Sequence, residues 1–356
     1  MEQYRIALIP GDGIGKEVTQ EGRRILDTVA FLDKRFSFLY QEFPWGCDYY
    51  LQHGRMMEED GLEQLKAFDA ILLGAVGDPR VPDHLSLRDL LLRIRQGFDQ
   101  YVNLRPVVLL KGAPCRIKDI QQQDVNITFI RENSEGEYAG LGGFYDQGLP
   151  SERAEQVAVF SRKGTERIIR YAYALAEKTG QTLTSITKGN ALNYSMVYWD
   201  RLFREIGKEY PSVETHQYMV DAAAMFLIQD PKRFQVVVTS NLFGDILTDL
   251  GTVLAGGMGL AAGANLNPEK RFPSMFEPIH GSAPDIAGQQ KANPLATIWA
   301  ASQLLDHLGY TEWGKKVLSA ISYVLQEKQA LTPDLHGSAS TEECGKAVAQ
   351  ALLTLA

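Results

Sequence analysis

The sequence predicts an α/β fold in which helices flank a large, mostly parallel β-sheet. Short apolar runs alternate with amphipathic helical patterns along the chain, which is the rhythm of strand–helix–strand units. The chain has 356 residues, of which 45% are hydrophobic, so it can bury a core of ordinary size. Because this length exceeds a usual single domain, we expect two lobes or one large α/β unit.

The expected elements follow one another in a regular order. Strands are predicted from short apolar runs at residues 4–9, 69–74, 102–109, 125–130, 182–187, 213–220 and 235–239. Helices are predicted from apolar residues that recur every three or four positions, at residues 16–30, 165–178, 196–210, 242–254, 296–308 and 312–327. Helical segments between strands favour parallel pairing.

The segment 135–161 departs from this rhythm. It is rich in glycine and ends in the alternating run 156–160. A protruding β arm that pairs with another subunit and a plain surface loop both fit this composition.

Composition limits the possible partners and the compartment. The formal net charge is -8 and no long basic run occurs, so we do not expect nucleic acid as a partner. The three cysteines are far apart and form no CxxC site, as in a reducing compartment. The chain enters a strand-like run at Tyr4 without a basic leader, and the apolar stretch 254–264 is too short to span a bilayer. We expect a cytoplasmic protein without a membrane segment.

A glycine-rich turn, Pro10–Gly15, follows the first predicted strand. Its spacing is GxGxG rather than GxGxxG, and Glu42 is the nearest candidate for the acidic residue that would close a second strand. The spacing therefore favours a tight strand-to-helix turn over a dinucleotide cradle, and it does not by itself predict NAD.

Three aspartates are candidate metal ligands. Asp245 and Asp249 are four residues apart, so on a helix they share one face, where like charges repel unless a cation lies between them. Asp221 follows the predicted strand 213–220 and would add a third oxygen ligand for Mg²⁺ or Mn²⁺. A solvated acidic face and a helix N-cap are the alternatives.

Three arginines are candidate clamps for carboxylates, because a guanidinium group binds a carboxylate with two parallel hydrogen bonds. Arg95 and Arg105 lie close together in the sequence, and Arg131 stands at the end of the predicted strand 125–130. Each is also compatible with a surface or salt-bridging role, and Arg88 and Arg93 are neighbouring decoys.

Tyr138 and Lys188 are candidate acid–base groups. Lys188 directly follows the predicted strand 182–187, at the end of the sheet where open α/β folds bind ligands. Burial or neighbouring cations would make either group usable in proton transfer. A surface lysine and a packing tyrosine are the alternatives.

These pieces, in this order, resemble the β-decarboxylating dehydrogenases, a family that includes isopropylmalate, isocitrate, D-malate and tartrate dehydrogenases. The resemblance covers nearly the whole chain. It is carried by Ile9–Gly15, Asn103–Pro106, Arg131–Tyr138, Asn241–Asp249, Glu277–Gly288 and Ala292–Pro294.

Within the family the sequence looks most like the tartrate and D-malate branch. The supporting stretches are Trp45–Tyr50, His53–Met57, Val81–Leu87, Gln96–Tyr101 and Arg271–Pro278. Arg88 stands where that branch usually has a tryptophan, in a segment that tunes the variable group of the substrate. This departure leaves the preferred diacid open.

The resemblance implies an isopropylmalate-dehydrogenase-like fold of two lobes with the active site between them. Residues 1–101 and 258–356 would form a cofactor-binding lobe. Residues 102–257 would form a substrate, metal and dimerisation lobe with an arm at about 135–161. The implied homodimer brings Lys188 and Asp221 of one subunit beside Asp245 and Asp249 of the other.

The resemblance also implies a role for each candidate residue. Arg95, Arg105 and Arg131 would bind the substrate carboxylates, and Asp221, Asp245 and Asp249 would hold Mg²⁺ or Mn²⁺. Lys188 would accept the hydroxyl proton, and Tyr138 would protonate C3 after loss of CO₂. K⁺ is a further candidate cation.

The implied cofactor is NAD. The loop with His280, Gly281, Ser282, Ala283 and Asp285 would wrap the adenosine. An acidic Asp285 accepts two ribose hydroxyls and repels a 2′-phosphate; a helix cap is the alternative role. Two asparagines complete the implied cofactor set, Asn293 near the adenine and Asn190 near the nicotinamide amide.

Two alternatives to oxidation of a small 2-hydroxy diacid stay open. A 3-isopropylmalate dehydrogenase would need an apolar pocket lined by Leu90 or Leu91, against which Arg88 and Asp89 argue. A non-catalytic regulatory subunit of the same fold would have lost chemical groups that this chain retains.

Overall fold

The computed structural model describes residues 2–115 and 117–355 and divides the chain into two compact units. Unit 1 comprises Met1–Gln100, Val108–Gln122 and Thr252–Ala356. Unit 2 comprises Tyr101–Val107 and Gln123–Gly251. The assignment of cofactor and substrate roles to the two lobes stays a prediction.

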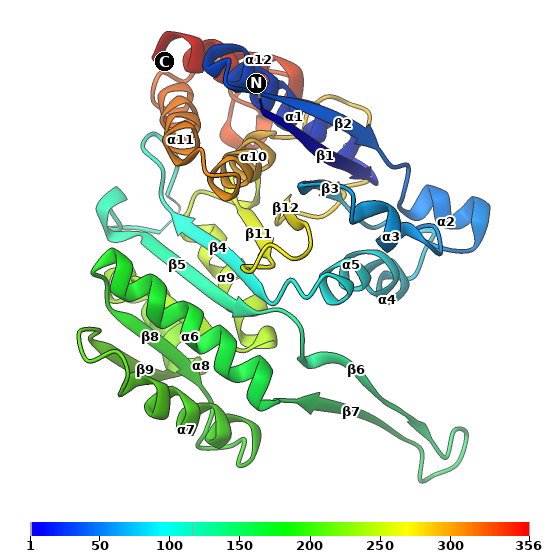
Figure 1. The fold of residues 1–356 in the computed structure, drawn as a ribbon, viewed down its shortest axis with the longest axis vertical. Helices are drawn as coiled ribbons and strands as arrows, with labels where there is room; N and C mark the ends of the chain where they lie inside the picture. Colours follow the sequence, from blue (N-terminus) through cyan, green and yellow to red (C-terminus); the bar gives the residue numbers. More distant parts are fainter. Residues whose placement is uncertain (1, 116, 356) are drawn as a thin grey trace. The chain divides into compact units, whose positions relative to one another are not determined.

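Unit 1 contains five strands in the order β2-β1-β3-β12-β11 (Figure 1). Their bounds are β1 Glu2–Gly11, β2 Phe36–Glu42, β3 Ala70–Ala75, β11 Ala262–Leu266 and β12 Ser274–Pro278. β1 pairs in parallel with β2 and β3, and β12 pairs in parallel with β3. β11 runs antiparallel to β12. Every residue of β3 is buried, as expected of a strand covered on both faces.

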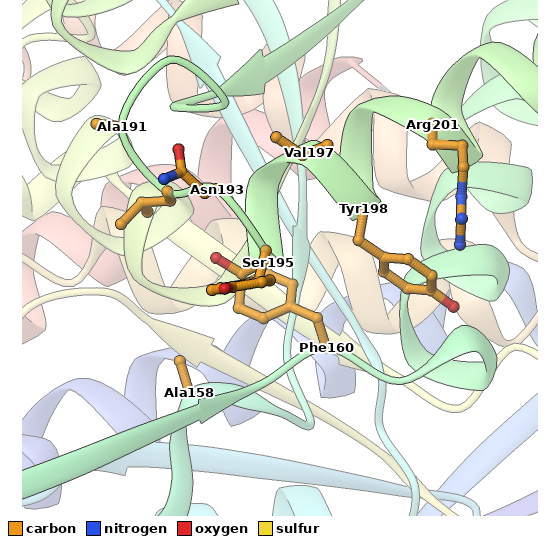
Figure 2. Close-up of a pocket in the computed structure, with 10 residues that line it drawn as sticks. Ala158, Phe160, Ala191, Asn193, Ser195, Val197, Tyr198 and Arg201 are labelled. Atoms are coloured by element: carbon orange, nitrogen blue, oxygen red, sulfur yellow. The ribbon is translucent and has the colours of Figure 1, made fainter.

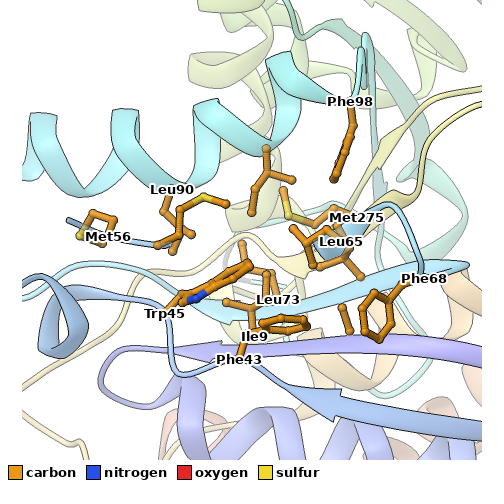
Figure 3. Close-up of a cluster of buried hydrophobic side chains, with 14 of the residues drawn as sticks. Ile9, Phe43, Trp45, Met56, Leu65, Phe68, Leu73, Leu90, Phe98 and Met275 are labelled. Carbon is orange, nitrogen blue, oxygen red and sulfur yellow. The ribbon is translucent and has the colours of Figure 1, made fainter. Parts of the chain in front are cut away.

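Four long helices form two layers over one face of the unit 1 sheet. They are α1 Gly15–Asp33, α10 Leu295–His307, α11 Thr311–Gln326 and α12 Thr341–Leu355. Helices α1 and α10 lie against the strands, and α11 and α12 pack on those two helices. The other face carries an apolar cluster in which Trp45, Leu73 and Phe98 are almost completely buried (Figure 3). Short helices surround this cluster: α2 Cys47–His53, α3 Gly61–Leu65, α4 Asp83–Ser86, the π-helix Leu87–Leu92 and α5 Arg93–Gly97. Three single-turn 3₁₀ helices lie at Gln122–Asp124, Met258–Leu260 and Pro333–Leu335.

Unit 2 contains five strands in the order β4-β5-β10-β8-β9. Their bounds are β4 Val102–Val108, β5 Asn126–Glu132, β8 Leu183–Thr187, β9 Thr215–Met219 and β10 Val236–Thr239. β10 pairs in parallel with β5 and β8, and β8 pairs in parallel with β9. The carboxyl ends of β5, β8, β9 and β10 therefore meet at one edge of the sheet. The prediction of a largely parallel α/β fold is confirmed.

Helices cover both faces of the unit 2 sheet (Figure 1). α6 Arg162–Thr179 and α7 Ser195–Gly207 lie on one face, and α8 Val220–Gln229 and α9 Asn241–Leu254 lie on the other; a 3₁₀ turn at Pro231–Arg233 follows α8. α6 begins at Ser161, whose side chain accepts a hydrogen bond from the Gly164 N–H, and ends at Gly180 in the left-handed conformation.

The segment 135–161 forms a two-stranded antiparallel hairpin, made of β6 Gly136–Tyr145 and β7 Arg153–Val159. The hairpin is a separate sheet that extends away from the rest of unit 2 (Figure 1). Leu141, Phe144 and Leu149 are exposed on it. A hairpin arm is therefore present, and its pairing with another subunit stays a prediction.

The glycine-rich turn joins β1 directly to α1, as its spacing predicted. Gly11 and Gly13 adopt positive φ values of 69° and 53°. The buried carboxylate of Asp12 accepts hydrogen bonds from the backbone N–H groups of Cys47 at 2.7 Å and Gly77 at 2.9 Å. The aspartate therefore holds the turn in place. Among the described residues, no helix is both long and apolar enough to cross a bilayer.

Gly11 and Gly54 form a matched pair for testing the turn, because their φ values are 69° and 70°. A Cβ at Gly11 would lie 2.0 Å from the carbonyl oxygen of Ala75, whereas nothing lies within 4 Å of one at Gly54. We expect Gly54→Ala to lower the free energy of unfolding by about 1 kcal/mol, because an alanine is strained at this positive φ. Gly11→Ala should lower it by at least about 2 kcal/mol more, because the close contact is added. Urea denaturation measures both, and equal losses would contradict the close approach.

Candidate active site

A cluster of charged groups forms around Asp245 on helix α9. Arg131, near the end of β5, donates from Nη1 to Oδ1 of Asp245 at 2.5 Å. Arg105 in β4 lies with its Nη1 3.4 Å from the same oxygen. The Tyr138 hydroxyl of β6 donates to the other oxygen, Oδ2, at 2.7 Å. The structure thus brings four of the predicted site residues of unit 2 together.

One face of α9 supplies the acceptors for the two arginines. Asn241, Asp245 and Thr248 have the i, i+4, i+7 spacing that aligns side chains along a helix. Oδ1 of Asn241 accepts from Nε and Nη2 of Arg131 at 3.0 Å and 2.7 Å. Oγ1 of Thr248 accepts from Nη1 of Arg105 at 2.7 Å. Because both guanidinium groups are buried, such acceptors are needed to offset their desolvation.

Gly244 makes room for this arrangement. A Cβ at Gly244 would lie 2.6 Å from Cγ of Arg131 and 2.4 Å from Oγ1 of Thr239. The stem of Arg131 therefore passes against the helix backbone where any larger residue would displace it.

Tyr138 is held in its protonated form. Burial raises the pKa of its phenol to about 12, with the neighbouring charge and hydrogen bond of Asp245 acting in the same direction. The positive charges of Arg131 and Arg105 oppose this rise. A phenol with this pKa is a proton donor at neutral pH.

Lys188 and Asp221 form a second pair at the carboxyl ends of β8 and β9. Nζ of Lys188 donates to Oδ1 of Asp221 at 2.8 Å, and this contact lowers the pKa of the Asp221 carboxyl. Asp221 lies in the first turn of α8, where the N-cap residue is Met219. Its carboxylate is exposed, so it is available to a ligand.

The three predicted metal ligands do not meet in one copy of the chain. Asp245 and Asp249 lie on α9, and Asp221 lies on α8. Within residues 2–115 and 117–355, no group of three or more His, Cys, Asp or Glu side chains is arranged to hold a metal ion.

Arg95, the third predicted clamp, lies in unit 1. Its Nη2 is 2.5 Å from Oε1 of Glu277, and both side chains are almost fully buried. Nδ2 of Asn265 donates to the same oxygen at 2.8 Å. The two neighbouring arginines differ from Arg95 in their partners. Arg88 is exposed and pairs with Asp89, and Arg93 donates to the main-chain oxygen of Glu59.

The predicted cofactor loop packs on the glycine-rich turn within unit 1. The Ile14 N–H donates to the main-chain oxygen of Ser282 at 2.8 Å. A Cβ at Gly13 would lie 2.0 Å from that oxygen. The glycine-rich turn therefore uses the Ile14 N–H and the space beside Gly13 to hold the Ser282 backbone, and not to bind a phosphate.

The remaining cofactor candidates lie in different settings. Asp285 and Gly281 are exposed, and Nδ1 of His280 lies 3.0 Å from the main-chain oxygen of Gly281. Asn293 is buried; its side chain donates to Asp334 and accepts from the backbone N–H of Leu295, the first residue of α10. Ala283 has a positive φ of 40°, and Asn190 is exposed in unit 2.

A cavity of about 820 Å³ lies elsewhere in unit 2, between the end of the arm and the start of α7 (Figure 2). Phe160, Tyr198 and Arg201 line it, together with the strongly exposed Tyr194. None of the predicted site residues lines this cavity, so it does not mark the candidate active site.

Sequence reasoning gave no role to Asn241, Gly244, Thr248 or Glu277. The first three share a helix face with Asp245, and this spacing is visible in the sequence. What the sequence does not contain is which arginine each would meet. Glu277 is separated from Arg95 by 182 positions, and no local pattern indicates that pair.

In this α/β fold, two buried arginines from β4 and β5 converge with an aspartate of α9 and a protonated tyrosine of β6. Such a cluster defines the class of an α/β enzyme with a site for a small anionic substrate. Comparison with known proteins agrees with this class. The sequence model of the isocitrate/isopropylmalate dehydrogenase family matches residues 5–348.

Individual relatives match over almost their full length. The chain is 46% identical over 344 residues to the probable tartrate dehydrogenase/decarboxylase of Bacillus subtilis (strain 168), with 96% of each chain covered. It is 47% identical over 363 residues to the D-malate dehydrogenase (decarboxylating) of Escherichia coli (strain K12), with 99% of each covered. The crystal structure of isocitrate dehydrogenase from Methylococcus capsulatus matches with a TM-score of 0.87 at 33% identity, covering 98% of this chain and 99% of that one.

The chain therefore belongs to the isocitrate/isopropylmalate dehydrogenase family and is an oxidoreductase. The predicted family resemblance is confirmed.

Loss of the Arg95–Glu277 pair should strongly destabilise unit 1. Glu277→Gln keeps the shape and removes the charge, which leaves a buried guanidinium group without its anion. We expect the free energy of unfolding to fall by about 3 kcal/mol. Asp89→Asn removes the partner of the exposed Arg88 and should change it by less than about 0.5 kcal/mol. Denaturant unfolding of both variants checks this, and similar effects of the two substitutions would refute it.

Proposed function

We propose that this enzyme oxidises a small 2-hydroxy diacid such as D-malate or tartrate, with NAD as hydride acceptor and a divalent metal ion, and that CO₂ is then lost. The observation that carries the proposal is the Asp245 cluster, in which one carboxylate lies between two buried arginines and a protonated tyrosine. The names of the relatives, tartrate and D-malate dehydrogenases, support the same substrate class.

The arginines are suited to bind the substrate. Arg105 and Arg131 are almost fully buried, so an anion that reaches them interacts in a medium of low dielectric. A guanidinium group binds a carboxylate through two parallel hydrogen bonds, and a diacid has two carboxylates that such groups can bind. We assign Arg95 as the third contact, held in place by Glu277.

The residues fit a divalent cation. Asp245 and Asp249 lie four apart on α9 and offer the hard oxygen ligands that Mg²⁺ and Mn²⁺ prefer. Asp221 of a second copy would add a third carboxylate. A cation bound there would lower the pKa of the C2 hydroxyl and polarise the adjacent carbonyl. K⁺ stays a candidate without assigned residues.

The loop of unit 1 fits NAD. The exposed Asp285 offers a carboxylate to the ribose hydroxyls and would repel the 2′-phosphate of NADP. His280, Gly281, Ser282, Ala283 and Asn293 would surround the adenosine, and Asn190 would meet the nicotinamide amide. When bound, the nicotinamide ring supplies the acceptor for the hydride from C2.

Proton transfers fall to two side chains. Lys188, after its ammonium group has given one proton to water, would receive the C2 hydroxyl proton through water as the hydride leaves C2. The bond between C3 and its carboxylate then breaks, and CO₂ departs without its bonding electron pair. Tyr138 donates its proton to the electron pair left at C3, a role suited to a phenol whose pKa is raised to about 12.

We propose that the enzyme is a homodimer with each site built from both copies. Lys188 and Asp221 form one cluster and Asp245 and Asp249 another, and neither is a complete site. Exposed apolar residues support contact with a second copy: Met225 on α8 and Ile246 on α9, with Phe144 on the arm. The free cysteines among the described residues agree with a cytoplasmic location.

One alternative is weakened by a specific observation. A 3-isopropylmalate dehydrogenase would use Leu90 or Leu91 to line an apolar substrate pocket. Leu90 is completely buried in the unit 1 core, and Leu91 packs against the same cluster. A non-catalytic subunit is disfavoured because all of the groups proposed for binding and proton transfer are retained in the chain.

A substrate panel tests the proposal. We expect D-malate or tartrate, with NAD and Mn²⁺, to give NADH together with CO₂. A chelator should abolish the reaction and added Mn²⁺ should restore it, and NADP should be a poor substitute. Absorbance of NADH and trapped CO₂ are measured in parallel. A preference for 3-isopropylmalate would replace the proposed substrate class, and a lack of turnover with every diacid would favour a non-catalytic role.

Co-expression of two inactive variants tests the shared site. Lys188→Ala and Asp245→Asn should each be inactive alone. In their heterodimer, one site carries both substitutions and the other carries neither. A random mixture should therefore recover about a quarter of the wild-type activity. If both catalytic clusters acted within one subunit, the mixture would stay inactive. A chain that carries both Lys188→Ala and Asp245→Asn, expressed alone, is the negative control and should stay inactive.

A further inference from the structure

Asn241 opens helix α9 and is almost fully buried, with 2% of its surface exposed. Its side-chain oxygen accepts two hydrogen bonds from Arg131, and its side-chain nitrogen donates to the main-chain oxygen of Glu135 at 2.9 Å. One amide group therefore joins three parts of unit 2: the end of β5, the start of α9 and the segment that leads into β6.

We propose that Asn241 is a positioning residue, which orients Arg131 toward the substrate carboxylate and holds the strand that carries Tyr138 in place beside Asp245. The inference rests on the proposed function, because it takes Arg131 and Tyr138 to meet the substrate. Asn241 itself need not touch the substrate.

The orientation of Arg131 follows from how its nitrogens are distributed. Nε and Nη2 both donate to the single oxygen of Asn241, which resists rotation of the guanidinium plane. Nη1 then points to Asp245. Loss of the amide removes two of these three bonds, and these two are the ones that resist rotation of the guanidinium plane.

The position of Tyr138 depends on the side-chain nitrogen of the same amide, which binds the Glu135 carbonyl. Gly136 turns the chain into β6 with a φ of 77°, and a Cβ there would lie 3.3 Å from Cβ of Asn241. The backbone thus passes closely over Asn241 just where the Glu135 carbonyl is held. Tyr138 lies two residues further on, with its ring 5.6 Å from Cζ of Arg131.

Only an asparagine satisfies all of these contacts. An aspartate would accept the same bonds from Arg131, but its charge would offset the positive charge that attracts a diacid. It would also set a carboxylate oxygen against the Glu135 carbonyl, where an N–H is now present. A serine or alanine is too short to reach, and glutamine adds a methylene to a fully packed position.

Kinetics of Asn241→Ala and Asn241→Asp test the inference. We expect KM for D-malate to rise about tenfold to a hundredfold in both, since hydrogen bonds to a charged group are lost or its charge is offset. KM for NAD should stay within about twofold, and kcat should fall as Tyr138 is displaced. Asn241→Ser replaces Asn241→Ala if the latter does not fold.

Asn267→Ala is the matched control. Asn267 is also a fully buried asparagine, and its side chain binds the backbone of Asp99 and Arg271 in unit 1. Its loss should lower thermal stability without raising KM for D-malate. A general loss of stability is thereby separated from a loss of positioning.

Crystal structures of the variants give a readout that does not need activity. The Arg131 guanidinium should leave its wild-type position in Asn241→Ala. If it stays in place and both variants keep KM within twofold of wild type, the inference is wrong. If Asn241→Asp alone behaves as wild type, the requirement for a neutral side chain is wrong. If the wild-type enzyme turns over no diacid, the proposed function fails, while the position of Arg131 still decides the inference.

Discussion

The burial of two guanidinium groups beside one carboxylate is the constraint on which the rest of unit 2 depends. Arg105 and Arg131 are each less than a tenth exposed, and a charge so far from water needs partners of fixed geometry. Helix α9 provides these partners through one acid, one amide and one hydroxyl at helical spacing. The start of α9, the middle of β4, the end of β5 and the approach to β6 all meet at these contacts.

Much of the fold is predictable from the sequence, because its elements obey simple periodicities. The strands near residues 4–9, 102–109 and 182–187 are apolar runs between helical patterns, and the structure has β1, β4 and β8 there. β2 and β11 are harder to predict. β2 is an edge strand with mixed exposure, and β11 is a short strand of small residues and asparagine. Their positions are set by neighbours distant in the sequence, which a local pattern does not contain.

The candidate site likewise has features that the sequence predicts and features that only the folded structure shows. Spacing alone indicates that Asp245 and Asp249 share a helix face, and that Lys188 follows a strand. Spacing does not indicate that Arg131 and Tyr138 converge on Asp245, since their contacts span 114 and 107 positions. Nor does it distinguish the buried Arg95 from the exposed Arg88, seven positions earlier, because the distinction comes from Glu277 in a remote strand. Convergence of this kind is a property of the folded topology.

The division of unit 1 into three stretches of chain has a consequence for biosynthesis. Its strand β3 lies between β1, made first, and β12, which begins only at Ser274. A nascent chain emerging from the ribosome therefore leaves one edge of β3 without its partner strand until most of the polypeptide has been translated. Unit 2 needs nothing beyond Gly251, so it is able to condense earlier. Premature termination after unit 2 would leave the backbone N–H and C=O groups on that edge of β3 open to pairing with other chains, and chaperones and proteases act on such species.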